Sequence, residues 1–143
     1  MYAYNPRKKT FQQLEKSLVG NDRWDILNGI MRELTLKKGE APKQHWMIVG
    51  PRGIGKSHLL TLLYHKVKDD KKVSKLWLPV LFPEELRMAG DLSKFLERAV
   101  SELLIDLERE KNPIAAELKP KIDKIKKVPI SERSDYIFSV LSW

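Results

Sequence analysis

The chain lacks cysteine, which excludes disulfide bonds and thiolate metal sites. It also lacks an apolar run approaching the roughly 18 residues of a membrane-spanning helix, and the apolar N-terminal stretch of a secretory signal peptide. Its three histidines, His45, His58 and His65, form no cluster of metal ligands, because His58 and His65 are too far apart for the usual zinc pair at i and i+4. These absences favour a cytoplasmic protein without a membrane partner.

Basic side chains are in excess and unevenly distributed. The 143 residues carry 27 lysines and arginines against 19 acidic residues, and the 42% hydrophobic content is typical of one globular domain. Residues 41–80 hold 8 basic and 2 acidic side chains, a surplus that attracts a polyanion such as a nucleotide. The lysines there also offer a surface for nucleic acid, although a solvated face is the favoured interpretation because aromatic residues are not interleaved: Lys66, Lys68, Lys71, Lys72 and Lys75.

Residues 50–57 match the phosphate-loop, or Walker A, pattern G-x-x-x-x-G-K-[ST] at each specified position. Glycines let the backbone turn successive N–H groups into one concavity, and a helix that starts there adds the positive end of its dipole. Lys56 would reach the β- and γ-phosphates, and the Ser57 hydroxyl would bind Mg²⁺. A glycine turn that merely caps an ordinary helix is the alternative. The predicted nucleotide-binding residues are Gly50, Pro51, Arg52, Gly53, Ile54, Gly55, Lys56, Ser57 and His58, with Ser57 as the metal ligand.

The segments on either side of the loop predict the elements that such a site requires. The apolar residues 46–49 predict a buried strand that leads into the loop, and residues 56–67 predict the helix that leaves it. A second strand is predicted at residues 75–82, at a sheet edge because Pro79 lacks the N–H that a central strand donates. An apolar stripe over residues 92–107 is the clearest helical signal in the chain.

Shorter helical segments complete the prediction. Phe11, Leu14 and Leu18 indicate a short amphipathic turn or helix. Asp22 is the expected N-cap of the next helix, in which Gly29 costs about 1 kcal/mol relative to alanine and so indicates a close packing partner. The remaining expectations are a helix start at Asp91, a cap-then-N1 signature at Asn112 and Pro113, a kink or break at Pro120, and a helix over residues 131–141.

A nucleotide hydrolase also needs an acid-bearing strand, the Walker B element, to hold Mg²⁺ and orient the attacking water. Residues 103–106 imitate this element with an apolar run that ends in Asp106. They continue the helical stripe that begins at Leu92, however, and no turn residue separates them from it. We therefore assign residues 103–106 to the helix and expect the hydrolytic half of the site to lie outside this sequence.

The loop, together with Val19, Gly20 and the acidic Asp22 ahead of a helix, resembles the start of an AAA+ or STAND-type ATPase of the origin-recognition and archaeal ATPase kind. In that family a V-G-R-[DE] box lines the adenine pocket, so the resemblance implies that Val19 and Gly20 contact the base. Asn21 stands where that family usually has arginine, which leaves the base preference open. The resemblance implies ATP and Mg²⁺ as cofactors, and it covers about residues 15–110.

The resemblance also implies a fold. We expect an α/β P-loop NTPase domain of three αβα layers with a parallel sheet, truncated so that two strands and a helix-rich C-terminal half are present. Residues 1–17 would form a lead-in, and residues 18–143 a partial ATPase domain that ends before the Walker B strand. Strands supplied by a partner chain, or an irregular fold, are the alternatives to a fragment of a longer ATPase.

The expected function is ATP and Mg²⁺ binding by the N-terminal part of a switch-type ATPase, with other copies of itself, a partner chain or DNA as further partners. The parent family hydrolyses ATP, but no Walker B element, sensor or arginine finger is present here, so the sequence leaves enzymatic activity open. A small-molecule kinase would need an arginine cluster on a lid, which the sequence does not show. A nucleic-acid-binding or interaction protein using its lysine-rich surface, and an inactive fragment, remain as alternatives.

Overall fold

The computed structural model describes residues 11–18, 20–35, 46–82 and 91–141. Within these ranges the chain forms α helices and 3-10 helices and no β strand, so the predicted αβα fold with a parallel sheet is wrong for the described residues. The chain divides into two compact units, Met1–Leu81 and Phe82–Trp143. No helix in the described ranges combines the length and apolarity that a membrane span requires.

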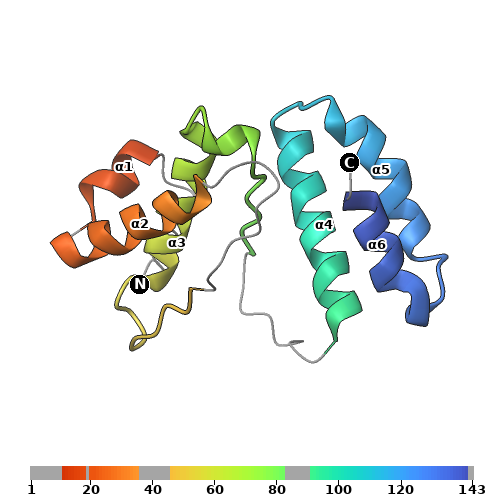
Figure 1. Ribbon diagram of the computed structural model, residues 1–143, viewed down its shortest axis with the longest axis horizontal. Coiled ribbons are helices and arrows are strands. Elements are labelled where there is room, and N and C mark those ends of the chain that lie inside the picture. Colours follow the sequence, from red (N-terminus) through yellow and green to blue (C-terminus); the bar gives the residue numbers. More distant parts are fainter. Residues whose placement is uncertain (1–10, 19, 36–45, 83–90, 142–143) are drawn as a thin grey trace, which may run out of the picture. The chain divides into compact units, whose positions relative to one another are not determined.

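The first unit is built on three α helices, α1 (Phe11–Lys16), α2 (Asn21–Leu34) and α3 (Lys56–Asp69) (Figure 1). Helices α1 and α2 both pack against α3. Leu14, Leu27 and Leu62, one from each helix, are 0% exposed in a shared core. Burying a leucine completely contributes about 1.5–3 kcal/mol. The short helix predicted from Phe11 and the helix predicted after the loop are thus confirmed, and their packing supports the loop that precedes α3.

The segment ahead of the loop differs from its prediction. Residues 46–49 adopt neither strand nor helix, and Met47 and Val49 are 87% and 77% exposed. Ile48 packs against the core shared by α1, α2 and α3. The apolar pattern therefore buries one side chain but does not make a strand, because a strand also needs a neighbour that bonds its backbone, and none of the described residues supplies one.

Trp46 has a separate packing role. A Cβ built on Gly29 of α2 would lie 3.3 Å from Cη2 of the Trp46 ring, closer than most such contacts in proteins. The close packing partner predicted for Gly29 is confirmed, and the absence of a side chain at this helical position makes room for the indole.

The second predicted strand, residues 75–82, is also wrong. The 3-10 helix η2 (Val73–Lys75) ends inside it, and residues 77–82, including Pro79, form neither strand nor helix. Trp77 anchors this segment instead, since its indole Nε1 donates to the Leu34 carbonyl oxygen at 2.8 Å. Its ring packs on a cluster formed by Met31, Val67 and Val73. Trp77 thus binds the segment to α2 and α3, whereas Leu76 and Leu78, two of the apolar side chains that suggested a strand, are exposed.

A side-chain turn at the end of α3 explains why η2 forms. The Asp70 carboxylate accepts hydrogen bonds from the backbone N–H groups of Lys72 and Val73 at 2.8 and 2.9 Å. These two bonds reverse the chain immediately after α3. They also hold the pKa of the Asp70 carboxyl below its ordinary value, because both donors favour the charged form.

The second unit is a bundle of α4 (Leu92–Arg109), α5 (Ile114–Ile125) and α6 (Arg133–Leu141), with the 3-10 helix η3 (Ile130–Glu132) before α6 (Figure 1). The three α helices pack against one another around a core of Leu96, Val100, Ile125 and Ile137. The stripe predicted over residues 92–107 is confirmed as helical, and its exposed members are Leu92 and Phe95. The buried members are Leu96, Val100, Leu103 and Leu107. Residues 103–106 lie within this helix, as predicted, and do not form a Walker B strand.

Local capping signals in this unit behave largely as the sequence predicts. Asp91 is the N-cap of α4, and its carboxylate accepts from a backbone N–H of the first turn at 3.3 Å. The N-cap of α5 is Pro113, with φ −60°, so the predicted cap at Asn112 is one residue too early. Asn112 Oδ1 still accepts from the N–H of Ile114 at 3.0 Å. Of the predicted kink or break at Pro120, the break is wrong, because α5 continues through this residue.

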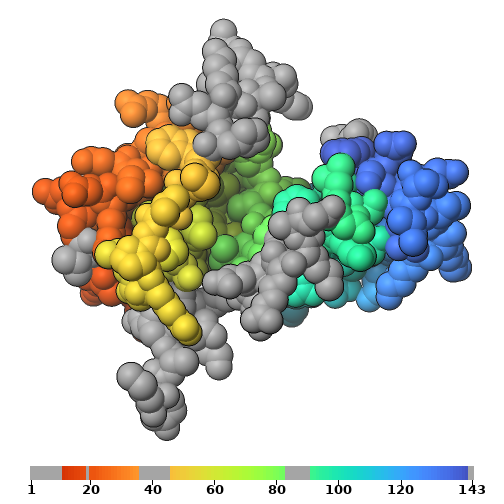
Figure 2. Space-filling view, turned by 90° about the horizontal axis from the view of Figure 1, so that it is seen from below, coloured from red at the N-terminus to blue at the C-terminus, as the bar shows by residue number. Residues whose placement is uncertain are grey.

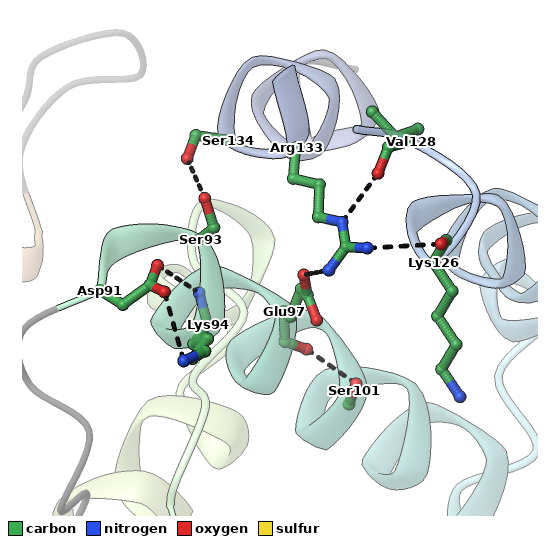
Figure 3. Close-up of polar contacts among 9 residues, drawn as sticks. All are labelled: Asp91, Ser93, Lys94, Glu97, Ser101, Lys126, Val128, Arg133 and Ser134. Carbon is green, nitrogen blue, oxygen red and sulfur yellow. Dashed lines mark hydrogen bonds and ion pairs between the residues drawn. The ribbon is translucent and has the colours of Figure 1, made fainter. Parts of the chain in front are cut away.

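Arg133 ties the start of α6 to the rest of the bundle (Figure 3). Its guanidinium donates to Glu97 of α4 at 2.9 Å and to the Val128 carbonyl oxygen, also at 2.9 Å. Figure 3 also shows Ser93 and Ser134, whose hydroxyl oxygens are 2.9 Å apart. These polar contacts fix α6 against the N-terminal half of α4, next to the apolar core.

Candidate functional site: the phosphate loop

The phosphate loop leads directly into α3, whose N-cap is Gly55. Gly53 and Gly55 have φ values of +86° and +99°, which side chains rarely allow. A Cβ on Gly50 would lie 3.1 Å from Cγ2 of Ile54, so a side chain at this position would press on that residue. Figure 2 shows the loop and the start of α3, in yellow, at the surface of the first unit. Two of the three glycines of the loop, Gly53 and Gly55, therefore adopt backbone conformations that favour glycine.

Lys56 is the first residue of α3, and its side chain turns back over the loop. Its Nζ donates to the Gly50 carbonyl oxygen at 2.6 Å and to the Pro51 carbonyl oxygen at 2.9 Å. An ammonium group has three N–H donors, so these two contacts leave one for an anion. The two carbonyl groups thereby hold a positive charge directly over the loop.

The first turn of α3 adds backbone donors to this charge. The opening N–H groups of an α helix have no acceptor within the helix, and they form the positive end of its dipole. The N-cap of α3 makes no side-chain hydrogen bond, and its first turn contains no acidic residue. Ser57 lies in this turn with an exposed side chain. The arrangement favours an anion, with a hydroxyl beside it that can bind Mg²⁺.

Arg23, which the predicted site did not include, reaches the loop from the first turn of α2. Its Nη2 donates to the Ile54 carbonyl oxygen at 2.8 Å. Its Nη1 lies 3.6 Å from the position that a Cβ would take on Gly55. The one available signal was its place immediately after residues 19–22, the segment that resembles an adenine-pocket box. The structure therefore adds a second cation to the loop, from a different helix.

The box itself is described only in part. Val19 lies outside the described residues. Gly20 is the N-cap of α2 with φ +97°, so the prediction that Asp22 is the cap is wrong, and Asp22 lies in the first turn instead. Gly20 is thus three residues before Arg23, which joins this end of α2 to the loop.

The remaining predicted residues divide between the surface and the core. Pro51, Arg52 and Ile54 have exposed side chains on the loop. His58 is buried, with 8% exposure, and its Nε2 donates to the Leu14 carbonyl oxygen of α1 at 2.8 Å. These contacts of the imidazole fix α3 against α1, which supports the loop from behind the first turn.

The described residues contain no group of three or more acidic or histidine side chains that could hold a metal ion by themselves. The acidic residue of the Walker B imitation, Asp106, forms an ion pair with Arg109 at 3.1 Å on α4. Magnesium binds proteins through few side chains and keeps waters and substrate phosphates as its other ligands. The residues present therefore fit a metal that arrives with a nucleotide and is held by Ser57, phosphate oxygens and water.

The lysine-rich surface near the end of α3 is partly engaged within the first unit. Lys66 Nζ lies 5.3 Å from the centre of the Trp24 ring and donates to Asn28 Oδ1 at 3.2 Å. Lys68 Nζ lies 4.6 Å from the centre of the Tyr64 ring. The exposed lysines of this surface are those of the following turn and η2: Lys71, Lys72 and Lys75.

No family model, curated protein or solved structure matches the chain. The geometry of the loop is therefore the basis for any functional conclusion.

Proposed function

We propose that the chain binds ATP, or another nucleoside triphosphate, together with Mg²⁺ through residues 50–57. The observation that carries the proposal is the position of the Lys56 ammonium, which is held on the Gly50 and Pro51 carbonyl oxygens of the loop. The positive φ values of Gly53 and Gly55 are compatible with it, because glycine in this region lets successive backbone N–H groups turn toward one concavity.

In this proposal the phosphates are recognised by three kinds of group. The third N–H of Lys56 donates to a phosphate oxygen, and the N–H groups at the start of α3 donate to the same chain of phosphates. The Ser57 hydroxyl would hold the Mg²⁺ that accompanies the phosphates. Magnesium supplies charge neutralisation for the triphosphate. Hydrolysis is not part of the proposal, because it needs an acidic group that the described residues do not bring to the loop.

We further propose that this binding belongs to a cytoplasmic switch ATPase of the AAA+ or STAND kind, acting with other copies of itself or a partner chain. Its supports are the Walker A pattern and the neighbouring residues 19–22. The contact of Arg23 with Ile54 adds a physical link between that segment and the loop.

The test is a calorimetric titration of the chain with MgATP beside three variants. Lys56→Ala removes the charge over the loop and should weaken binding at least tenfold, which corresponds to about 1.4 kcal/mol. Ser57→Ala should weaken binding in the presence of Mg²⁺ and change it little when the metal is chelated. Lys72→Ala is the matched control, because this lysine is exposed at the turn after α3 and should leave the affinity unchanged. Wild-type chain that does not bind, or that binds no better than Lys56→Ala, contradicts the proposal.

A second candidate function, nucleic-acid binding, is favoured by the exposed Lys71, Lys72 and Lys75. It predicts salt-dependent binding to duplex DNA that survives Lys56→Ala and weakens in Lys72→Ala. The same two variants thus separate the two functions, because Lys56→Ala should weaken only MgATP binding and Lys72→Ala should weaken only DNA binding. Binding of both ligands would identify DNA as an additional partner of the ATP-binding chain.

A further inference from the structure

The peptide group between Ile54 and Gly55 is held from outside the loop. Arg23 Nη2 donates to the Ile54 carbonyl oxygen at 2.8 Å, across 31 positions in sequence. The hydrogen bond within the loop itself, from the Ile54 N–H to the Pro51 carbonyl oxygen, is long at 3.4 Å. The side chains of Arg23 and Lys56 therefore constrain the loop more closely than this backbone bond does.

Because the peptide group is planar, the contact of Arg23 with the Ile54 carbonyl group also determines the direction of the Gly55 N–H. In a trans peptide the C=O of one residue and the N–H of the next point in opposite directions, and no described peptide bond is cis. Because the Ile54 C=O points at Arg23, the Gly55 N–H points away from Arg23. The same relation holds at Pro51, whose C=O points at Lys56, so that the Arg52 N–H points away from Lys56.

Because residue 55 is glycine, the orientation of the peptide group between Ile54 and Gly55 depends on the hydrogen bond from Arg23. The Gly55 φ of +99° lies where glycine moves easily between conformations, so neither a side chain nor a ladder of backbone bonds fixes this peptide group. A Cβ at Gly55 would be in ordinary contact with the guanidinium, at 3.6 Å from Nη1. The guanidinium thus lies along the backbone at the point where the loop becomes α3.

We propose that Arg23 is a positioning residue that sets the Gly55 N–H for phosphate binding by holding the Ile54 carbonyl group. This inference rests on the proposed function and deepens it. Arg23 acts through the peptide group, so its effect extends to any ligand that has the phosphate chain, whether or not the ligand has a base. Because Arg23 belongs to the first turn of α2, it also couples the position of this helix end to the phosphate-binding conformation of the loop.

The probe is inorganic tripolyphosphate with Mg²⁺, which has the phosphate chain of ATP and no base. Arg23→Ala should weaken its binding about tenfold, and Arg23→Lys, which keeps a charged donor, should recover part of the loss. Arg32→Ala is the matched control, because this exposed arginine lies on the last turn of the same helix. Low millimolar guanidinium ion should restore part of the affinity of Arg23→Ala and have no effect on the wild-type chain.

An amide NMR spectrum tests the role of Arg23 directly, because the response of the Gly55 amide shift to ligand would not change if Arg23 only stabilised the fold. In the wild-type chain the Gly55 amide proton should shift downfield when tripolyphosphate is added, because it donates to a phosphate oxygen. In Arg23→Ala the shift should be reduced even at saturating ligand. Arg23→Gln, which keeps a neutral donor, replaces the alanine variant if that variant does not fold.

The outcomes separate this inference from the proposed function. If neither ATP nor tripolyphosphate binds the wild-type chain, the proposed function fails and the inference fails with it. If Lys56→Ala loses binding while Arg23→Ala keeps both its affinity and the Gly55 shift, the inference alone is overturned. A weaker affinity with an unchanged Gly55 shift and no rescue by guanidinium also overturns it, because Arg23 would then act as a plain charge.

Discussion

The two units of the molecule are stabilised in different ways. In the second unit α4, α5 and α6 share one core, and capping residues such as Asp91 and Asn112 lie close in sequence to the N–H groups they accept from. In the first unit Met47 and Val49 remain exposed, and the loop is held by side chains that bond to its carbonyl groups. Local signals therefore mark where helices of the bundle begin, whereas the conformation of the phosphate loop depends on a side chain from another helix of its unit.

The two units have separate cores, and a core substitution in each unit tests whether they unfold separately. Leu62→Ala in α3 and Ile137→Ala in α6 each remove a side chain that is 0% exposed, and each should cost about 2–5 kcal/mol. Hydrogen exchange should show faster exchange in α1–α3 for Leu62→Ala and in α4–α6 for Ile137→Ala. Equal acceleration of both units by either variant would mean that the two cores unfold together.

The polar contacts of Arg133 should contribute measurably to the stability of the second unit. Arg133→Ala should lower the free energy of unfolding by about 2 kcal/mol, because it removes hydrogen bonds to Glu97 and Val128 and leaves the half-buried carboxylate without this partner. The measurement is urea denaturation followed by circular dichroism. Arg109→Ala is the control, since its side chain is 70% exposed and its loss should change stability by at most about 0.5 kcal/mol.

In the first unit, an alanine substitution at Gly53 tests the backbone conformation of the loop. Gly53→Ala places a side chain at φ +86° and should cost about 1 kcal/mol of stability, or change the loop so that the anion affinity falls. Gly29→Ala gives a contrast, because its effect comes from helix propensity and from contact with Trp46, and not from φ. Melting temperature and MgATP affinity should therefore separate the two variants. A Gly53→Ala chain that matches the wild type in both would contradict the described loop.

The smallest effect is expected at the turn after α3. The folded-state pKa of Asp70 is lowered, mainly by hydrogen bonds from Val73 and Lys72, so its charged form stabilises the fold above the ordinary carboxyl pKa. This contribution should be lost as the pH falls through the lowered pKa. Asp70→Asn keeps an acceptor oxygen without the charge. The melting temperatures of the two proteins, compared from pH 6 to pH 2, should differ least at the acid end; a constant difference would contradict the assignment.

Helices with a continuous apolar stripe were predictable from the sequence, and strands and long-range contacts were not. The stripe over residues 92–107 determines α4 because its periodicity and the cap at Asp91 act locally. Residues 46–49 have strand-like apolarity, but a strand exists only where another segment bonds to it. The motif identified Lys56 and the glycines, because their spacing carries the chemistry. Arg23 was missed because its contact with Ile54 joins residues whose proximity depends on the packing of α2 and α3.

The most direct test of the central claim is hydrogen exchange of the whole chain with and without MgATP, read segment by segment. Nucleotide binding should slow exchange at the phosphate loop, the first turn of α3 and the start of α2, and leave α4, α5 and α6 unchanged. Lys56→Ala should abolish this difference. Protection confined to the second unit, or protection of the loop that persists in Lys56→Ala, would contradict the claim that residues 50–57 bind the nucleotide.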